Sequence, residues 1–392
     1  MVASAAACSL RLVYLVHDLN DPAVVRRIEM LRPYLVSAVV IGFFRSAESP
    51  TQVAGWHAVG LGRTADGQLG RRALSVLQAQ FHRRRLKSHF RGATVVIARQ
   101  LEMLTLAVAL RGRYAQKATL AYECLDIHRL MLTSSVVTSA LRALEARLLA
   151  KVDLLIVSSP AFIADYFQPV HGARVPRVCL LENKVLNSEH STVLPNAQRE
   201  AGPPWRIGLA GMLRCRHSLV LLADLTRQLQ GKVVVELHGR PSKSAIPDFD
   251  ALIDATPAMH FFGPYDRQRG LANVYRAVHF TWAIDFYEAD GNSRWLLPNR
   301  LYEGGLHGAI PIALASVETG RWLDRNNAGV VLKDPVSETL LHYFTTLQMP
   351  DYATEVDRLA AVPREAWIDD GRDGLDLVAA LLLRRGEKQC SG

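Results

Sequence analysis

A polar stretch in the second half of the chain combines groups that are able to bind a phosphorylated ligand. Gly291, Asn292 and Ser293 form a small polar loop, and Pro298 is suited to the first turn of a helix that follows it. The fixed φ of proline and its missing N–H carry no penalty at that position. Exposed backbone N–H groups in such a loop bind anions, so this stretch is a candidate site for a diphosphate.

The helix after this loop carries two polar side chains on one face. Asn299 and Glu303 are four residues apart, which is about one helical turn. A carboxylate in that place is able to accept two hydrogen bonds from a ribose diol. Gly308 is suited to the left-handed residue that ends a helix before a buried strand. A helix with a solvated glutamate and a glycine-rich turn explains the same spacing, and that alternative stays open.

Short β-rich runs alternate with longer helical patterns along the chain. Several runs are continuously apolar, which is typical of strands buried on both faces of a parallel sheet. The alternation predicts βαβ crossovers and an α/β fold with doubly wound sheets. The predicted strands are Leu10–Val16, Ala38–Phe43, Thr94–Ala98, Thr119–Tyr122, Leu154–Ser158, Val178–Leu181, Arg206–Ala210, Val233–Leu237, His260–Phe262, Phe280–Ile284, Ile310–Ala315 and Gly329–Leu332. The predicted helices include Ala23–Arg32, Arg71–His89, Ser134–Lys151, Leu219–Gln230, Leu271–Val278 and Asp373–Arg385.

A polar segment divides the chain into two halves of similar architecture. Asn187–Pro204 contains three prolines and no apolar periodicity, which is typical of a linker. We expect one Rossmann-like domain over residues 1–195, a second over residues 205–370, and a C-terminal helix and tail over residues 371–392. Ligands of doubly wound sheets bind at the carboxyl ends of the strands, so we expect the site in a crevice between the two domains.

The composition excludes several classes of protein. The 392 residues are 49% hydrophobic and 21% charged, which argues against wholesale disorder. No apolar run approaches the roughly 20 residues of a membrane span, and the start of the chain lacks the basic region of a secretory signal. The five cysteines form no CxxC pair and the 13 histidines show no metal-ligand spacing. We therefore expect a cytoplasmic protein without a bound metal.

The positive charge is concentrated in the first half. Residues up to Pro195 include 24 Lys+Arg and 13 Asp+Glu, whereas the remainder has 22 and 24. The densest basic run is Phe81–Arg91. A solvated helix face is the ordinary explanation of such a run, and contact with anionic lipid headgroups is the functional one. Nucleic acid is not expected as a partner, because no recognised binding motif accompanies the run.

The stretch around Glu303 resembles the nucleotide-sugar signature of GT-B glycosyltransferases, especially family 4 and its bacterial exopolysaccharide relatives. In that signature a Glu-Ala/Gly-x-x-x-Gly helix end follows a glycine-containing loop and precedes a proline-containing strand. Glu303-Gly304, Gly308 and Pro311 fall close to it. The resemblance implies a GT-B fold, with two Rossmann-like domains facing each other across a crevice. It also implies sugar transfer from a nucleotide diphosphate sugar to a saccharide acceptor, which we expect to be lipid-linked, in exopolysaccharide or surface polysaccharide biosynthesis. No cofactor and no metal are implied.

The resemblance also assigns roles in donor binding. Glu303, with Asn299 beside it, would bind the nucleotide ribose, and Gly291, Asn292 and Ser293 would approach the sugar and phosphates. Tyr265 lies in a loop that would touch the nucleobase. The residues expected near the diphosphate are Gly211, Arg214 and Arg216. Apart from the resemblance, His238 follows a predicted strand and is a candidate to contact the sugar or phosphate, and a simple turn explains it equally well.

The chain departs from the family pattern at two places. Trp295 stands where members usually carry a second glutamate, eight residues before the one that binds ribose. The first loop of the donor domain usually reads Gly-Arg followed some residues later by Lys. Here it reads Gly211-Met212-Leu213-Arg214-Cys215-Arg216, so either arginine is a candidate to neutralise the diphosphate.

The first half contains the candidates for acceptor binding and proton transfer. His17 and Asp18 follow the first predicted strand and are candidates to meet the acceptor, while Asp21 is suited to cap the next helix. Asp126 and His128 resemble the Asp-x-His element of many GT-B acceptor domains. We expect Asp126 to be the base of an inverting enzyme, with His128 as the alternative, or to position the acceptor in a retaining one.

Three alternatives remain open at this stage. An ion pair between Glu123 and Arg129 would make the Asp126 segment merely structural. An epimerase acting on a nucleotide sugar has the same fold and needs no acceptor. A non-catalytic protein that binds a nucleotide sugar or a saccharide fits the same architecture.

Overall fold

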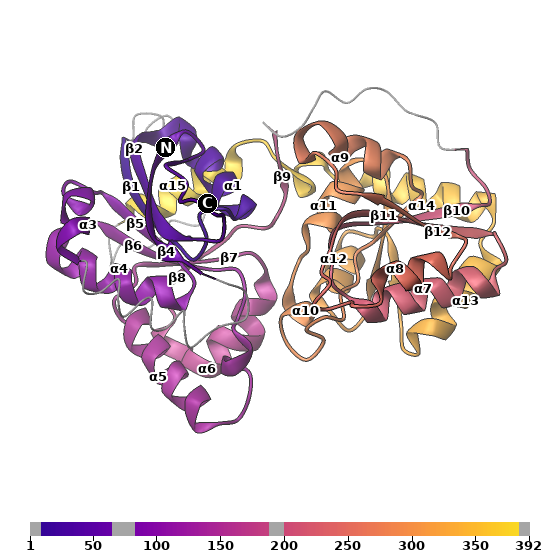
Figure 1. Cartoon of the computed structure of the whole chain (residues 1–392), viewed down its shortest axis with the longest axis horizontal. Helices are drawn as coiled ribbons and strands as arrows, with labels where there is room; N and C mark the ends of the chain where they lie inside the picture. Colours follow the sequence, from indigo (N-terminus) through magenta and orange to yellow (C-terminus); the bar gives the residue numbers. More distant parts are fainter. Residues whose placement is uncertain (1–8, 65–82, 188–199, 384–392) are drawn as a thin grey trace. The chain divides into compact units, whose positions relative to one another are not determined.

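The structure is a computed structural model (Figure 1), and it describes residues 9–64, 83–187 and 200–383. The chain divides into two compact units, each with its own sheet. The first unit ends at Leu181 and resumes at Gly371, and the second unit spans Glu182–Asp370. Within the described ranges, no helix is long and apolar enough to cross a membrane. The predicted crevice between the two domains stays a prediction.

An eight-stranded sheet forms the centre of the first unit. Its strands are parallel except β3, which is antiparallel to β4. In sheet order they are β3 (Gln52–Val53), β4 (Trp56–Arg63), β2 (Leu35–Phe44), β1 (Leu10–Val16), β5 (Val95–Arg99), β6 (Thr119–Cys124), β7 (Leu154–Val157) and β8 (Arg177–Leu180). The helices are α1 (Pro22–Leu31), α3 (Arg83–Phe90), α4 (Leu101–Tyr114), α5 (Val136–Leu149), α6 (Gln168–His171) and α15 (Arg372–Leu382), with 3-10 turns at Arg32–Tyr34, Arg129–Met131 and Gly172–Arg174 and a π-helix at Phe162–Phe167.

A six-stranded parallel sheet forms the centre of the second unit, with helices above and below it in Figure 1. In sheet order the strands are β12 (Met259–Gly263), β11 (Val233–Pro241), β10 (Trp205–Leu213), β13 (Phe280–Trp282), β14 (Ile310–Leu314) and β15 (Val330–Leu332). The helices are α7 (Arg216–Gln228), α8 (Phe249–Asp254), α9 (Arg267–Arg276), α10 (Asn292–Trp295), α11 (Asn299–Leu306), α12 (Glu318–Arg325), α13 (Val336–Thr346) and α14 (Met349–Ala361), with a 3-10 turn at Arg364–Ala366.

The apolar runs predicted the strands well. Every predicted strand is present, although β10 and β11 extend further than their apolar cores. The short β3 and the longer β4 were not predicted, because Trp56–Arg63 mixes polar residues with two glycines. The helix predicted over Arg71–His89 is described only as α3, since residues 65–82 lie outside the described ranges.

The division between the units lies earlier than the linker composition predicts. A short strand β9 (Val185–Leu186) pairs in parallel with β16 (Ile368–Asp369). This pairing ties the residues after Leu181 to the second unit rather than to a first domain over 1–195. In the first unit, α15 packs against β6, β8 and α1. The C-terminal helix is therefore part of that unit rather than a separate segment from residue 371.

Two glycines set the position of α11. A Cβ atom on Gly304 would lie 2.3 Å from Cγ2 of Thr281 in β13, and one on Gly305 would lie 2.3 Å from Cζ3 of Trp367. The helix is thus confined between the sheet and an indole ring, and neither neighbouring surface leaves room for a side chain. This close packing buries Glu303, the residue just before the two glycines.

Gly304→Ala should lower the free energy of unfolding by about 1–3 kcal/mol, because the added methyl group must displace the strand or the helix. Chemical denaturation of the purified chain measures the change. Gly112→Ala in α4 is the matched control, since its new Cβ meets no atom within 4 Å. The control should be neutral or up to about 1 kcal/mol more stable. Equal effects of the two substitutions would contradict this account of α11.

Candidate functional site

Glu303 is a buried carboxylate held by one tyrosine and one arginine. It is 2% exposed. The Tyr275 hydroxyl donates a hydrogen bond to Oε2 at 2.9 Å, and Nη1 of Arg267 lies 2.7 Å from Oε1. Tyr275 is fully buried, whereas the Arg267 side chain is 34% exposed. A carboxylate offers about four acceptor positions, so positions remain beyond these two contacts.

Tyr265 is part of the same electrostatic cluster, and its expected contact with the nucleobase stays a prediction. Burial and then the charge of Glu303 raise the pKa of Tyr265 to about 12, against the opposing charges of Arg267 and Arg300. Burial and Glu303 also raise the pKa of Tyr275 well above its ordinary value. Both hydroxyls therefore stay protonated near neutral pH, and the Tyr275 hydroxyl donates a hydrogen bond to Glu303.

The start and end of α11 match the sequence pattern closely. The helix begins at Asn299, with Pro298 just before it rather than inside the first turn. Gly308 has a φ of +76°, which is the left-handed conformation predicted for the helix end. Asn299 is exposed, and it lies one turn before the buried Glu303.

A pocket at the ends of β10 and β13 contains two arginines and one aspartate. Nη2 of Arg214 lies 3.3 Å from Oδ2 of Asp285, and Nη2 of Arg300 lies 3.9 Å from the same oxygen. Arg214 also lies over the ring of Tyr287, 4.7 Å from its centroid. The pocket encloses about 240 Å³, including space open to solvent. The sequence did not single out Arg300 and Asp285, because only the fold brings them beside Arg214.

The structure places Arg214 and Arg216, the two alternatives that the sequence left open, in different surroundings. Arg214 lines the pocket, whereas Arg216 forms an exposed ion pair with Asp248 at 2.6 Å. Gly211, three residues before Arg214, has a φ of +110°, and a Cβ atom there would meet nothing within 4 Å. The backbone at Gly211 is therefore open to approach by a ligand.

The loop at Gly291, Asn292 and Ser293 is closed on itself. The N–H groups of Gly291 and Ser293 both donate to the carbonyl oxygen of Glu288, at 2.9 and 3.2 Å, and the Asn292 amide donates to the Glu288 carboxylate at 2.7 Å. The prediction of exposed backbone N–H groups is therefore wrong for Gly291 and Ser293. Ser293 instead lines a second pocket that also includes Asp285, with a volume of about 340 Å³ when space open to solvent is counted.

The side chain of His238 contacts Glu236 and Phe262, which line neither of these two pockets. Its Nε2 is 3.5 Å from the Glu236 carboxylate, and its ring stacks on Phe262 with centroids 4.8 Å apart. Glu236 in turn pairs with Arg206 at 2.8 Å. These contacts explain the position of His238 without a ligand, and the predicted contact to sugar or phosphate stays a prediction.

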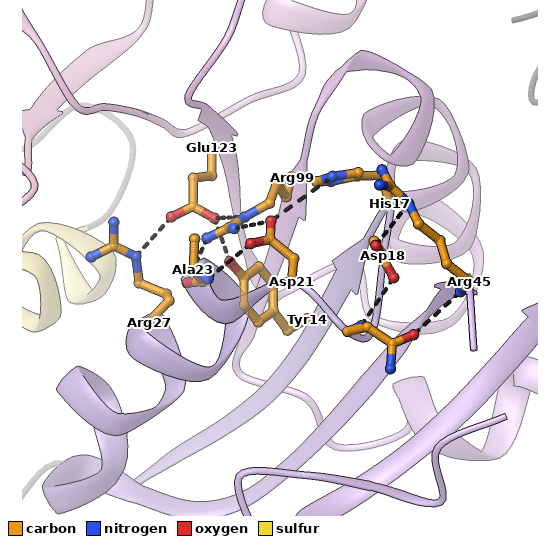
Figure 2. A network of polar contacts seen from close by, with 10 residues as sticks. Tyr14, His17, Asp18, Asp21, Ala23, Arg27, Arg45, Arg99 and Glu123 are labelled. Atoms are coloured by element: carbon orange, nitrogen blue, oxygen red, sulfur yellow. Dashed lines mark hydrogen bonds and ion pairs between the residues drawn. The ribbon is translucent and has the colours of Figure 1, made fainter. Parts of the chain in front are cut away.

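A buried ion network lies at the carboxyl ends of β1, β5 and β6 in the first unit (Figure 2). The parallel register places Tyr14, Arg99 and Glu123 on one face of the sheet. The fully buried Glu123 accepts from Nε of Arg27 at 2.7 Å and from Nε of Arg99 at 2.8 Å, and the Tyr14 hydroxyl donates to the same carboxylate. The partners of Glu123 are thus Arg27 and Arg99, and the ion pair with Arg129 considered from the sequence is not formed.

Arg99 connects this network to the loop between β1 and α1. Its Nη1 lies 3.1 Å from Oδ2 of Asp21, and its Nη2 donates to the carbonyl of Ala23 at 3.0 Å (Figure 2). Asp21 also caps α1 by accepting from the N–H of Ala23, as predicted. One buried guanidinium therefore fixes the start of α1.

His17 and Asp18 lie in that loop but differ in exposure. Asp18 is 5% exposed; its Oδ2 pairs with Nε of Arg45 at 2.9 Å and its Oδ1 accepts from the N–H of Asn20. The Nε2 atom of His17 lies 3.9 Å from the Asp21 carboxylate, and its side chain is 21% exposed (Figure 2). Asp18 thus orders the loop. Its side chain is less exposed to an acceptor than the side chain of His17.

Asp126 and His128 follow β6 and are both exposed. Nδ1 of His128 accepts a hydrogen bond from the Leu130 N–H at 3.1 Å and so caps a 3-10 turn. A neutral imidazole that accepts through Nδ1 carries its proton on Nε2. This turn orients the His128 ring, and the expected roles of Asp126 and His128 in proton transfer stay predictions.

A curated relative matches almost the whole chain. The succinoglycan biosynthesis protein ExoL of Rhizobium meliloti (strain 1021) is 42% identical over 376 residues, which cover 95% of this chain and 93% of that protein. The chain belongs to the ExoL family. No protein-family model matches the sequence.

Solved structures place the ExoL-family chain in the GT-B fold. Sucrose-phosphate synthase from Thermosynechococcus elongatus has a TM-score of 0.68 at 13% identity, with 94% of each chain covered. HepE from Anabaena in complex with UDP and glucose has a TM-score of 0.66 at 14% identity, covering 95% of this chain and 99% of that one. WaaG, a glycosyltransferase involved in lipopolysaccharide biosynthesis, has a TM-score of 0.62 at 15% identity, covering 94% and 99%. The predicted fold is confirmed.

Glu123→Gln should lower the free energy of unfolding near neutral pH by roughly 3–5 kcal/mol, because two buried guanidinium groups lose their counter-charge. Urea denaturation measures the change. Glu29→Gln is the matched control. It removes a partly exposed pair with Arg32 and should change stability by at most about 1 kcal/mol.

The same variant should show a defined pH dependence. Burial raises the pKa of Glu123, but the charges of Arg99 and Arg27 outweigh burial and hold this pKa at about 2, below the ordinary value of 4.5. The carboxylate thus stabilises the fold above its ordinary pKa, and this contribution is lost as the pH falls through the lowered value. The difference in unfolding free energy between wild type and Glu123→Gln should therefore shrink as the pH falls from 4.5 to about 2. A difference independent of pH would contradict the assignment.

Proposed function

We propose that this ExoL-family chain is a glycosyltransferase that moves a sugar from a nucleotide diphosphate sugar to a saccharide acceptor, which is lipid-linked, in exopolysaccharide or surface polysaccharide biosynthesis. The observation that carries the proposal is the Glu303 carboxylate, buried yet not saturated, on the helix that also carries Arg300. The name of the relative, a succinoglycan biosynthesis protein, supports the pathway class. The UDP and glucose bound by HepE support a nucleotide-sugar donor.

In the proposed donor complex, Glu303 accepts two hydrogen bonds from the ribose diol. Tyr265 lies against the nucleobase, and the open backbone at Gly211 lets the diphosphate approach Arg214. Guanidinium groups pair with phosphate oxygens through two parallel hydrogen bonds, and they neutralise charge as the diphosphate leaves. We propose that these side chains supply the positive charge and that the enzyme needs no cofactor besides its donor substrate.

In the proposed transfer step, the acceptor hydroxyl oxygen attacks C1 of the donor sugar. The bond between C1 and the diphosphate oxygen breaks, and the hydroxyl proton passes to the Asp126 carboxylate if the configuration inverts. In a retaining reaction Asp126 would hold the acceptor hydroxyl instead. His17 is the proposed acceptor-binding residue, and its side chain is partly exposed. The ion network around Arg99 holds the loop of His17 in place.

We further propose that the basic first half contacts an anionic membrane that carries the acceptor, at its cytoplasmic face. The described part of the basic run supports this proposal. In α3, Leu86 and Phe90 are buried while Arg85, Lys87 and the following Arg91 are exposed. Each exposed basic residue near an anionic surface adds about 1 kcal/mol of attraction.

Glu303→Gln should raise the donor KM by roughly 10- to 100-fold, because hydrogen bonds to a charged group contribute about 1.5–3 kcal/mol. Steady-state kinetics with the cognate nucleotide sugar measures the change. Glu318→Gln in α12 is the matched control, since it removes a buried carboxylate that pairs with Arg321 and Arg325. The control should lose stability with an unchanged donor KM. An unchanged KM in Glu303→Gln would overturn the assignment of the donor site.

Asp126→Asn should lower kcat by roughly 10²- to 10⁴-fold, the usual contribution of a general base, with the donor KM nearly unchanged. His128→Asn is the matched variant, because asparagine can also cap the following turn. It should lose far less activity. If His128→Asn is inactive while Asp126→Asn is not, Asp126 is not the base.

The same assay separates the two rival functions. A transferase releases nucleoside diphosphate only when an acceptor is present, whereas an epimerase converts the donor without an acceptor. Tight donor binding without turnover, across a broad panel of acceptors, would favour a non-catalytic binding protein.

A further inference from the structure

Asp285 is shared by two arginines, and both contacts are long. Arg214 and Arg300 lie 3.3 and 3.9 Å from the same carboxylate oxygen, Oδ2. Charge-assisted N–H···O contacts are typically 2.7–2.9 Å. Three other arginine–carboxylate pairs of this unit meet that standard: Arg206–Glu236 at 2.8 Å, Arg216–Asp248 at 2.6 Å and Arg267–Glu303 at 2.7 Å. The two guanidinium groups at Asp285 are therefore less completely paired than the others.

Other contacts keep the three side chains in place despite the long distances. Oδ1 of Asp285 accepts from the N–H of Tyr287 at 2.9 Å. Arg214 lies over the Tyr287 ring, a cation–π arrangement that fixes its plane. Nη2 of Arg300 donates to the carbonyl of Ile284 at 3.2 Å. The cluster is thus arranged in advance, with one more positive than negative charge.

The cluster also lies next to the Glu303 cluster. Arg300 and Glu303 are three residues apart on α11, so they share a helix face. The charge of Arg300 also reaches Tyr265 and Tyr275, whose pKa values it lowers against the larger effect of burial. In a nucleoside diphosphate the phosphates are attached to the ribose, so a ribose at Glu303 directs the phosphates toward a neighbouring cation.

We propose that Arg300, together with Arg214, binds the diphosphate of the donor, and that Asp285 is an internal counter-anion which the diphosphate displaces. This inference rests on the proposed function. A diphosphate offers more charge and more acceptor oxygens than one carboxylate, so it replaces Asp285 at both guanidinium groups. Asp285 then competes with every phosphate ligand, and it recaptures the arginines when the nucleoside diphosphate product leaves.

Substitutions of Arg300 and of Asp285 should therefore change the affinity for the nucleoside diphosphate in opposite directions. Arg300→Gln should weaken binding of the nucleoside diphosphate by at least tenfold, whereas Asp285→Asn should tighten it by about three- to tenfold. Asp285→Asn combined with Arg214→Gln and Arg300→Gln should show no tightening, because there is no cation left to release. Binding of the plain nucleoside should change little in every variant, since it carries no phosphate.

Isothermal titration calorimetry on the full-length chain tests this, first with UDP, GDP, ADP and TDP and then with the matching nucleoside of the one that binds. Asp248→Asn is the matched control, because it frees the exposed Arg216 and should leave the affinity unchanged. If Asp285→Asn weakens binding, Asp285 orients the arginines rather than competes for them, and the inference is overturned. An unchanged affinity in Arg300→Gln also overturns it.

Two readouts keep the inference separate from the function on which it rests. If the wild-type chain binds none of the four diphosphates while it is folded, the proposed function fails, and this inference fails with it. If the wild type binds one of them but Asp285→Asn does not tighten it, only the inference fails. Should Arg300→Gln not fold, Arg300→Lys retains the charge, and a smaller but measurable weakening is expected because lysine lacks the planar fork.

Discussion

A buried carboxylate must be paired with positive charge or hydrogen-bond donors, and the two units of the molecule meet this constraint to different degrees. Removing one partner of such a pair costs roughly 3–5 kcal/mol. Glu123 meets the requirement completely, with two arginines and a tyrosine hydroxyl. Glu303 meets it with one tyrosine and one partly exposed arginine. A saturated carboxylate holds the fold together, whereas an unsaturated one retains capacity to bind a ligand.

The fold produces this difference through its packing. In the first unit, adjacent parallel strands bring Tyr14, Arg99 and Glu123 together by register alone, and Arg27 covers them from α1. In the second unit, Gly304 and Gly305 bring α11 close to the sheet. In the first arrangement Glu123 has three donors, and one of them, Arg99, also orders the loop that carries His17. The second buries Glu303 on a helix whose first residue, Asn299, is exposed.

Local patterns in the sequence were sufficient to predict the apolar strands, the left-handed Gly308 after α11, and Glu303 as a candidate, but not β3, β4, β9 or β16. These features depend on residues close together in the chain, where apolar runs and helical spacing carry the information. The partners of Glu123 were not predictable in this way. Arg27 and Arg99 lie far from it in sequence: Arg99 meets it through the parallel register and Arg27 reaches it from α1. Arg129 is near in sequence and does not pair with it.

The same limit explains the corrections at the second site. Arg214 and Arg216 are equivalent in sequence terms, and the structure distinguishes them, since Arg216 pairs with Asp248 just before α8 whereas Arg214 lines the pocket. The Gly291–Ser293 loop has the composition of an anion site, but the carbonyl of Glu288 takes up two of its N–H groups. The boundary between the units, which lies earlier in the sequence than predicted, likewise depends on a pairing between β9 and β16. These strands come from the first and last residues of the second unit's sequence.

The charge distribution of the second unit links these observations to the proposed chemistry. Positive charge that neutralises a leaving diphosphate must be present before the donor arrives, yet two neighbouring guanidinium groups repel each other in a site partly shielded from water. A carboxylate between them relieves that repulsion. A carboxylate at ideal distance would hold the arginines as firmly as Glu123 holds Arg99, and it would exclude the phosphate. The long contacts at Asp285 meet both needs, because they keep Arg214 and Arg300 in place and leave their hydrogen-bonding capacity largely unused.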